Sequence, residues 1–337
     1  MGNQNLKVAD MHCDTITELW YGRRADEQVN LLHNSLHIDL EKMQKGNYFL
    51  QNFAMFVNLR NNKDPLEAIM QLTDLFYREM EKYPDKISMV RSYQDIERNR
   101  ELGRMSAMLT IEEGGVCKGS LVHLRNLYRL GVRMMTLVWN YENELAFPNC
   151  IPEGESDQLF RFYPETELGL KEQGLLFLEE MERIGMIIDV SHLSDAGFYD
   201  VWRHTRKPFV ASHSNARAVC GHSRNLTDDM IRKLAERGGV IGLNYNADFL
   251  MEATGGENSC RSTACKMAEH VRYLMNTGGI GCVGLGSDFD GITGGSELAD
   301  CSKIPLLEAE LRKQGFHESE IEAIFCKNVL RVYKELL

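Results

Sequence analysis

The stretch that decides the fold is "VADMHCDTITELW", residues 8–20, in which a short apolar run ends in His12 and Asp14. Side chains alternate across a strand, so His12 and Asp14 point to the same side. An imidazole and a carboxylate at the end of a buried strand are typical of a functional site. The same arrangement recurs along the chain, and its repetition predicts both the fold and the chemistry.

Short strand-like runs recur eight times, most of them bounded by glycine, proline or polar residues. They are "KVADMHCD" (7–14), "YFLQNFAMFVN" (48–58), "MSAMLTIEE" (105–113), "VRMMTLVWN" (132–140), "GMIIDVSH" (185–192), "PFVASHS" (208–214), "GVIGLNYN" (239–246) and "CVGLGSDFDG" (282–291). Helical periodicity fills the gaps at 66–76, 175–181 and 321–332, and "NLTDDMIRKLAERGG" predicts a helix with Thr227 or Asp228 near its N-cap and Gly238 past its end.

Alternating strands and helices favour parallel βαβ units, and eight of them predict an α/β (β/α)8 barrel. An open, doubly wound sheet is the competing architecture. We expect one catalytic domain over residues 1–337, because no low-complexity linker interrupts the chain. The long, turn-rich segment 142–167 is interpreted as a lid or insertion.

The composition narrows the class of protein. The net charge is -11 and no basic run stands out, which argues against a nucleic-acid partner. The nine cysteines are scattered and form no CxxC pair, so free thiols in a reducing compartment are expected. The N-terminal "MGNQNLKVAD" lacks the apolar segment of a signal peptide, and no apolar run approaches the roughly 20 residues of a membrane span. We therefore expect a cytoplasmic protein with no membrane partner.

Metal-ligand residues follow five of the predicted strands. The carboxyl ends of barrel strands surround the active site, so these side chains should converge at one rim. They are His12 and Asp14, Glu112 and Glu113, His192, His213, and Asp288 and Asp290. Alternation along Leu109, Ile111 and Glu113 favours Glu113 over Glu112 as the inward group.

Three imidazoles and several carboxylates at one rim are typical of a metal site. Zinc accepts both ligand types, and two metals roughly 3.5–4 Å apart can share a water, polarise a carbonyl and so hydrolyse an amide. A single histidine after a strand is more often structural, and Asp195 is interpreted as a helix N-cap. Five strand ends with the same ligand chemistry are much harder to attribute to chance. The remaining histidines, His222 among them, are interpreted mostly as surface residues.

The ordered motifs resemble those of the membrane (renal) dipeptidase family of zinc peptidases, peptidase family M19, in the form of a soluble microbial-type member. The motifs are "HCD" (12–14), "EEGG" (112–115), "DVSH" (189–192), "SHS" (212–214), "HSRN" (222–225) and "GSDFDG" (286–291). The resemblance implies a (β/α)8 barrel with two Zn²⁺ ions that hydrolyses dipeptides through a metal-bridging hydroxide. It further implies His12 and Asp14 on one zinc, Glu113 bridging both, and His192 and His213 on the second.

The resemblance also assigns roles around the metals. Arg224 matches the arginine that binds the substrate carboxylate. Asp288 matches the residue that transfers protons during hydrolysis. Asp290 would instead support the loop or the residues around the metal ligands. Trp139 stands where vertebrate members have a histidine, so Asn140 or Tyr141 would supply the missing donor, or Trp139 would simply line the pocket. Trp139 and Tyr245 are expected to shape the side-chain pockets.

Several alternatives stay open. Manganese or cobalt could replace zinc in the same ligand set. The resemblance implies dipeptide substrates, and dipeptides with a D-residue at the C-terminal position could be among them. A related binuclear amidohydrolase acting on a lactam, a cyclic amide or an N-acyl amino acid is the alternative, and a non-enzymatic barrel is a third reading. Relatives suggest a homodimer.

Overall fold

The computed structural model describes residues 6–25, 29–154, 159–252, 262–292 and 295–337. Its strands are β1 (Val8–Asp10), β2 (Tyr48–Phe56), β3 (Ile87–Val90), β4 (Met105–Glu112), β5 (Met134–Thr136), β6 (Cys150–Pro152), β7 (Phe160–Phe162), β8 (Ile187–Asp189), β9 (Val210–Ala211), β10 (Val240–Leu243) and β11 (Val283–Leu285). The eight runs predicted from the sequence are β1, β2, β4, β5, β8, β9, β10 and β11.

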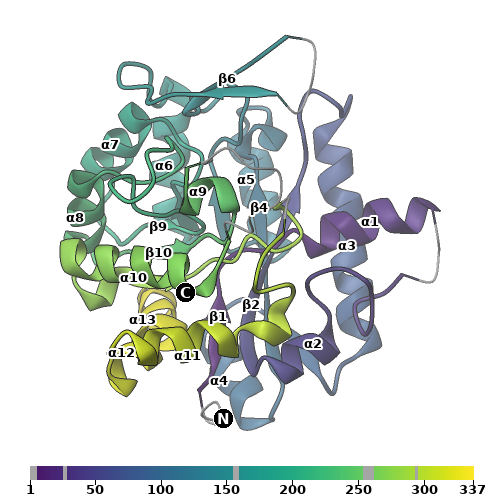
Figure 1. Cartoon of the computed structure of the whole chain (residues 1–337). Helices are drawn as coiled ribbons and strands as arrows, with labels where there is room; N and C mark the ends of the chain where they lie inside the picture. Colours follow the sequence, from purple (N-terminus) through teal and green to yellow (C-terminus); the bar gives the residue numbers. More distant parts are fainter. Residues whose placement is uncertain (1–5, 26–28, 155–158, 253–261, 293–294) are drawn as a thin grey trace.

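The helices alternate with these strands and surround them (Figure 1). They are α1 (Thr15–Ala25), α2 (Leu40–Lys45), α3 (Pro65–Lys82), α4 (Tyr93–Glu101), α5 (Leu121–Arg129), α6 (Glu172–Ile184), α7 (Asp195–His204), α8 (Asp228–Glu236), α9 (Ala247–Leu250), α10 (Ala264–Gly278), α11 (Pro305–Lys313), α12 (Glu318–Glu322) and α13 (Asn328–Leu336). Helix α8 begins as predicted, because the Thr227 hydroxyl caps it by accepting a hydrogen bond from the Met230 N–H.

The sheet closes on itself, which excludes the open, doubly wound alternative. Its order is β2-β1-β11-β10-β9-β8-β5-β4-β3, and β2 also pairs in parallel with β4. Eight strands therefore form a closed parallel barrel. Strand β3 is not part of the ring and pairs in parallel with the amino-terminal half of β4. Sequence reasoning missed β3 and the antiparallel β6–β7 hairpin in the 142–167 segment.

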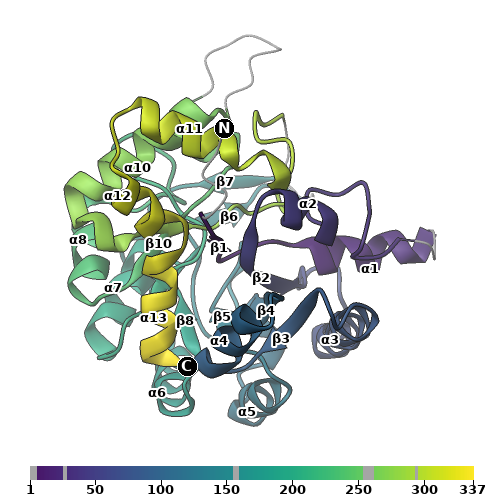
Figure 2. The same ribbon diagram turned by 90° about the horizontal axis from the view of Figure 1, so that it is seen from below.

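The barrel interior changes from apolar to polar along the strands. Met108, Met134, Ile187 and Val210 belong to one buried apolar cluster, together with Val329 and Tyr333 of the C-terminal helix. The helix α13 thus packs beneath the barrel and covers its amino-terminal end (Figure 2). Two residues further along the same strand faces stand Thr110, Thr136, Asp189 and Ser212, all buried and polar.

The opposite faces of the strands are apolar and pack against the helices. Leu109, Ile111, Met135 and Ile188 belong to the second, larger buried cluster, which extends into the surrounding helices. An apolar series along a strand of this barrel therefore marks the outward face, whereas the polar series leads to the rim at the carboxyl ends of the strands.

Every helix in the described part of the chain is too short or too polar to cross a lipid bilayer. The eight described cysteines are free thiols, as predicted, and seven of them are buried. The ninth, Cys260, lies outside the described residues.

Candidate metal centre

Five side chains from four strand ends meet above the barrel. His12 and Asp14 follow β1, Glu112 ends β4, His192 follows β8 and His213 follows β9. Their ligand atoms form two overlapping groups, His12–Asp14–Glu112 and Glu112–His192–His213, and Asp288 forms a third with His12 and His213; within each group the atoms lie within 4.8 Å of one another. The convergence predicted for His12, Asp14, His192 and His213 is therefore present.

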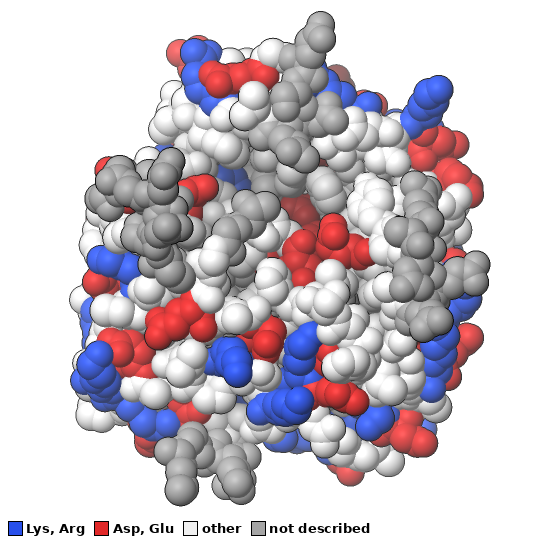
Figure 3. All heavy atoms as spheres, turned by 45° about the vertical axis from the view of Figure 1, so that its right-hand side comes forward, with Lys and Arg blue, Asp and Glu red and all other residues white. Residues whose placement is uncertain are grey.

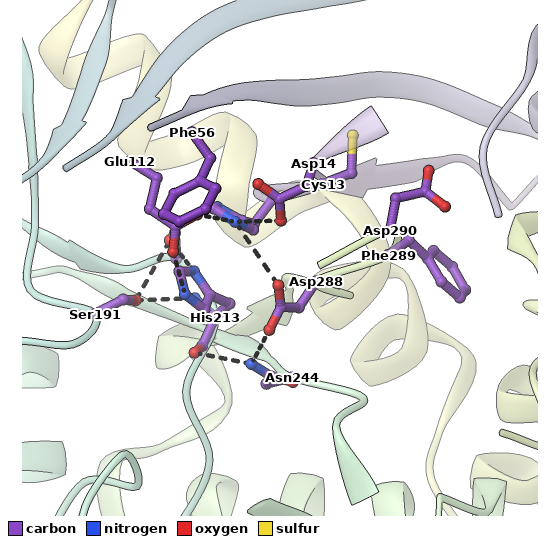
Figure 4. A network of polar contacts seen from close by, with 12 residues as sticks. Cys13, Asp14, Phe56, Glu112, Ser191, His213, Asn244, Asp288, Phe289 and Asp290 are labelled. Atoms are coloured by element: carbon purple, nitrogen blue, oxygen red, sulfur yellow. Dashed lines mark hydrogen bonds and ion pairs between the residues drawn. The ribbon is translucent and has the colours of Figure 1, made fainter. Parts of the chain in front are cut away.

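Glu112, not Glu113, supplies the carboxylate that the first two groups share. Its Oε2 lies 3.4 Å from Nε2 of His12, and its Oε1 lies 2.9 Å from Nε2 of His192. Glu112 stands two residues beyond Thr110, on the inward face of β4, and Figure 4 shows it beside Asp14 and His213. The sequence argument took the apolar Leu109–Ile111 series as the inward face, and that assumption was wrong.

Glu113 points away from the cluster. Its backbone has a φ of 99°, so the strand alternation stops at this residue. Its carboxylate accepts hydrogen bonds from the Gly115 N–H at 2.7 Å, the Asn143 side-chain amide at 2.6 Å and the Trp139 N–H at 3.1 Å. Burial raises the pKa of Glu113 to about 7 in spite of these donors. Glu113 thus fixes the loop after β5 rather than a metal.

The hydrogen bonds of His192 and His213 fix their protonation. The Ser212 hydroxyl donates its proton to Asp189 Oδ2 at 2.5 Å. Nδ1 of His213 lies 2.7 Å from Ser212 Oγ and must therefore donate to that oxygen. Nδ1 of His192 donates to Oδ1 of the Asn140 side chain at 2.9 Å. Burial lowers the pKa of His192 to about 4 and that of His213 well below its usual range, so both rings are neutral.

Both Nε2 atoms are consequently bare lone pairs, and they face each other at 2.9 Å beside a carboxylate oxygen of Glu112. Three electron pairs at this separation repel unless a cation lies among them. His12 Nε2 and Asp14 Oδ1 are also buried without a hydrogen-bond partner. Nitrogen and carboxylate donors of this kind fit zinc and related divalent metals. The residues present therefore fit a binuclear metal centre.

Asp288 and Asp290 play different parts. Asp288 Oδ1 lies 3.8 Å from His12 Nε2, and its Oδ2 accepts from the Asn244 amide at 2.8 Å. Burial is the main reason that the pKa of Asp288 is raised to about 6. Asp290 points away from the cluster (Figure 4) and accepts from the Thr15 hydroxyl and the His37 N–H, both at 2.6 Å. Asp290 therefore holds the loop after β11.

The backbone around the cluster is held in unusual conformations. Glu113, His192, Asp288 and Asp290 all have positive φ values, between 60° and 99°. Such conformations in non-glycine residues cost energy and are concentrated at functional sites. Gly291 is needed for a different reason, because a Cβ there would lie 2.2 Å from Asp14 Oδ2.

A cavity of about 750 Å³ opens above the cluster. Trp139 and Asn140 line it as predicted, together with residues that the sequence did not single out: Phe56, Phe160, Phe162 and Glu18. His222, interpreted from the sequence as a surface residue, is partly buried and also lines the cavity. Trp139 packs against Phe56 and Phe160, with ring centroids 4.8 and 5.5 Å apart. The β6–β7 hairpin of the 142–167 segment thus contributes one wall. Figure 3 shows acidic side chains gathered at a hollow near the middle of one face.

Two predicted substrate residues do not line this cavity. Tyr245 is fully buried beneath the rim, against Phe289, and does not line the cavity, which corrects the prediction. Arg224 is 4% exposed and lies behind His192. Its Nη2 donates to the His213 carbonyl at 3.3 Å and its Nη1 to Ser214 at 3.5 Å, while its Nε has no partner. Among the described residues, no carboxylate lies within ion-pair distance of Arg224.

The sequence model of the membrane dipeptidase family, peptidase family M19, matches residues 3–336. The chain belongs to this family. M19 enzymes are metallo-dipeptidases, and this chain is one of them. It is 33% identical over 317 residues to an uncharacterized dipeptidase of Schizosaccharomyces pombe, covering 89% of this chain and 72% of that one. It is 32% identical over 312 residues to dipeptidase aclJ of Aspergillus oryzae, and the match covers 89% of this chain and 70% of that one.

Two solved metallopeptidase structures share the fold. The dipeptidase AC, an M19 metallopeptidase, superposes with a TM-score of 0.88 at 26% identity over 98% of both chains. A metallopeptidase from Rhodobacter sphaeroides, solved with a phosphinate mimic of the dipeptide L-Ala-D-Ala, superposes with a TM-score of 0.85 at 24% identity, over 98% of this chain and 99% of that one.

Proposed function

We propose that this M19 chain hydrolyses dipeptides with two Zn²⁺ ions, one held by His12, Asp14 and Glu112 and the other by Glu112, His192 and His213. The observation that carries the proposal is the pair of bare imidazole Nε2 atoms, 2.9 Å apart beside Glu112. When bound, the two metals would polarise the scissile carbonyl and activate a water near neutral pH.

The chain's own residues bind the substrate and move the proton. Arg224 is a buried guanidinium without a carboxylate partner among the described residues, which supports its role as the clamp on the C-terminal carboxylate. Asp288, held by the Asn244 amide, would accept a proton from the attacking water and pass it to the departing amine. A carboxyl group whose pKa is about 6 is suited to both transfers.

Trp139 and Asn140 complete the site. The Trp139 ring and its aromatic neighbours exclude water from one side of the cavity. The side-chain oxygen of Asn140 orients His192, and the amide N–H groups of the same side chain are proposed as the oxyanion donor that would replace the vertebrate histidine. The proposed substrates include dipeptides with a D-residue at the C-terminal position, as the Rhodobacter sphaeroides relative binds a mimic of L-Ala-D-Ala. The native metal, the homodimer and the cytoplasmic location remain predictions.

The test is a kinetic screen of L,L and L,D dipeptides beside the same peptides amidated at the C-terminus. We expect metal-dependent hydrolysis of the free dipeptides, abolished by chelation and restored by zinc. Arg224→Ala should raise KM for the free dipeptides at least a hundredfold and leave the weak turnover of the amidated ones nearly unchanged. Efficient hydrolysis of amidated peptides, lactams or cyclic amides in preference to dipeptides would instead establish the alternative amidohydrolase activity.

A further inference from the structure

The cavity above the metal centre is more acidic than the metals require. Six of its lining side chains carry carboxylates, and among the described residues no lysine or arginine lines it. The six are Asp14, Glu18, Glu112, Asp248, Asp288 and Asp290. Two divalent cations would neutralise four of these charges. The lining then keeps two negative charges, which face the part of the substrate that lies away from Arg224.

Glu18 is the carboxylate on the β1–β2 side of the cavity that has no task in the fold. Asp290 is bound by Thr15 and His37, and Asp14 belongs to the metal centre. Glu18 is half-buried on the first turns of α1, and among the described residues no hydrogen bond or ion pair engages its carboxylate. Burial and the nearby Asp290 raise the pKa of Glu18, so a cation placed there would relieve both effects.

The position of Glu18 relative to Arg224 decides which part of a substrate it would meet. Arg224 follows β9, and in the order of the closed barrel β9 stands across the ring from β2, with β1 beside β2. A dipeptide whose C-terminal carboxylate lies at Arg224 and whose amide lies over the metals extends its N-terminal residue toward β1 and β2. The side chain of that residue would then point toward α1, where Glu18 lines the same cavity.

An aromatic surface leads from the metal centre toward Glu18. Phe56, the last residue of β2, lies beside Glu112 (Figure 4), and its N–H donates to the Thr17 hydroxyl at 3.0 Å. This bond ties the end of β2 to the residue next to Glu18. Long basic side chains bury an apolar stem along such a surface and keep the charged head at the polar end.

We propose that Glu18 is a specificity-determining residue that selects dipeptides with a basic N-terminal residue, lysine or arginine. The inference rests on the proposed function, since it takes the docking direction from Arg224 and the metal centre. It adds the substrate class that the site prefers.

The test compares Lys-Ala with Met-Ala, whose side chain has similar length and no charge, using the zinc-loaded enzyme. We expect the ratio of kcat/KM values to favour Lys-Ala in the wild type and to fall about tenfold in Glu18→Gln. Glu18→Lys should reverse the preference toward Glu-Ala. Added salt should lower the wild-type ratio, because the pair is only half-buried. Glu67→Gln, on the exposed face of α3, is the matched control and should keep the ratio.

The outcomes separate the two proposals. Hydrolysis of both dipeptides with no preference for Lys-Ala, or with a ratio that neither Glu18 variant changes, would overturn this inference and leave the dipeptidase assignment intact. Failure of the zinc-loaded enzyme to hydrolyse either dipeptide would overturn both.

Discussion

Glu112 and Glu113 are neighbours in the sequence, yet their carboxylates serve different parts of the molecule. Oε1 of Glu112 lies 2.9 Å from the His192 Nε2 atom, whereas Glu113 accepts hydrogen bonds from Gly115, Trp139 and Asn143. The change of direction occurs at the φ of 99° at Glu113. One glutamate thus joins the two halves of the candidate metal centre, and the other positions the loop that carries Trp139 and Asn140.

Ser212 should tune metal affinity through His213. Its hydroxyl connects Asp189 to Nδ1 of His213 and so keeps Nε2 free of a proton. Loss of the hydrogen-bond partner of a metal-binding histidine typically weakens metal binding by about 10- to 100-fold. Ser212→Ala should therefore weaken zinc binding by about that factor in a competition titration with a chelating dye. Ser319→Ala, on an exposed helix surface, is the control. Equal affinities for the two variants would show that His213 needs no such partner.

Arg217 should stabilise the segment that carries His222 and Arg224. It makes a two-pronged pair with Asp195, at 2.6 and 2.8 Å, and also donates to the Asn225 and Ser223 carbonyls. Removing one member of a fully buried pair costs about 3–5 kcal/mol; here Arg217 is 14% exposed and Asp195 keeps a hydrogen bond from Asn149, so the cost should be on the order of 2–3 kcal/mol. Arg217→Met should lower the free energy of unfolding by about that amount in a urea titration.

The control for Arg217 is Arg78→Met, which removes an exposed pair with Asp74 on α3. Exposed pairs contribute less than about 1 kcal/mol, so this variant should unfold close to the wild type. Similar unfolding free energies for the two variants would contradict the role given to Arg217.

The ion pairs of Glu180 should make the free energy of unfolding depend on pH. Glu180 accepts hydrogen bonds from Arg183 and Arg125, which lower its pKa from 4.5 to about 2 and join α6 to α5. A group whose pKa is lowered in the folded state contributes stability above its unfolded pKa and loses it as the pH falls toward the folded value. Glu180→Gln should be destabilised at pH 7 by up to about 1 kcal/mol.

The difference between Glu180→Gln and the wild type should shrink between about pH 4.5 and 2 in thermal unfolding. Glu179→Gln, at the neighbouring exposed position of the same helix, controls for helix propensity. A difference that stays constant down to the lowest of these pH values would rule out the pair as its source.

The barrel could be predicted because its signal is local and repeated. Each strand is a short run bounded by turn residues, and the eight runs correspond to the eight barrel strands. Strand β3 is only four residues long and pairs with β4 alone, so it carried no separate signal. Four of the five clustered side chains were also predictable, since each follows directly on such a run.

The choice between Glu112 and Glu113 was not predictable from alternation alone. That argument needs to know which face of β4 is inward, and here the inward face is the polar one, with Thr110 and Glu112. His192 shows the same difficulty. Ile188 packs outward, and His192 reaches the cluster through a φ of 68° rather than by strand alternation. His192 thus joins the cluster because it follows β8, and strand alternation alone would not have placed it there.

Whether Tyr245 and Glu18 line the cavity depends on contacts with residues that are distant in the sequence. Tyr245 sits at a strand end, but the loop after β11 covers it through Phe289. Glu18 lies on a helix, four residues beyond Asp14, where nothing in the local pattern marks it as part of a cavity. Both positions are set by how the loops above the barrel pack together.

The metal content of purified Glu112→Gln, measured beside Glu113→Gln and the wild type after zinc loading and gel filtration, tests the central claim most directly. Glu112 is shared by both ligand groups, so its loss should reduce two zinc ions per chain to less than one and abolish dipeptide hydrolysis. Glu113→Gln should keep both ions. Two zinc ions in Glu112→Gln, or their loss only in Glu113→Gln, would contradict the account.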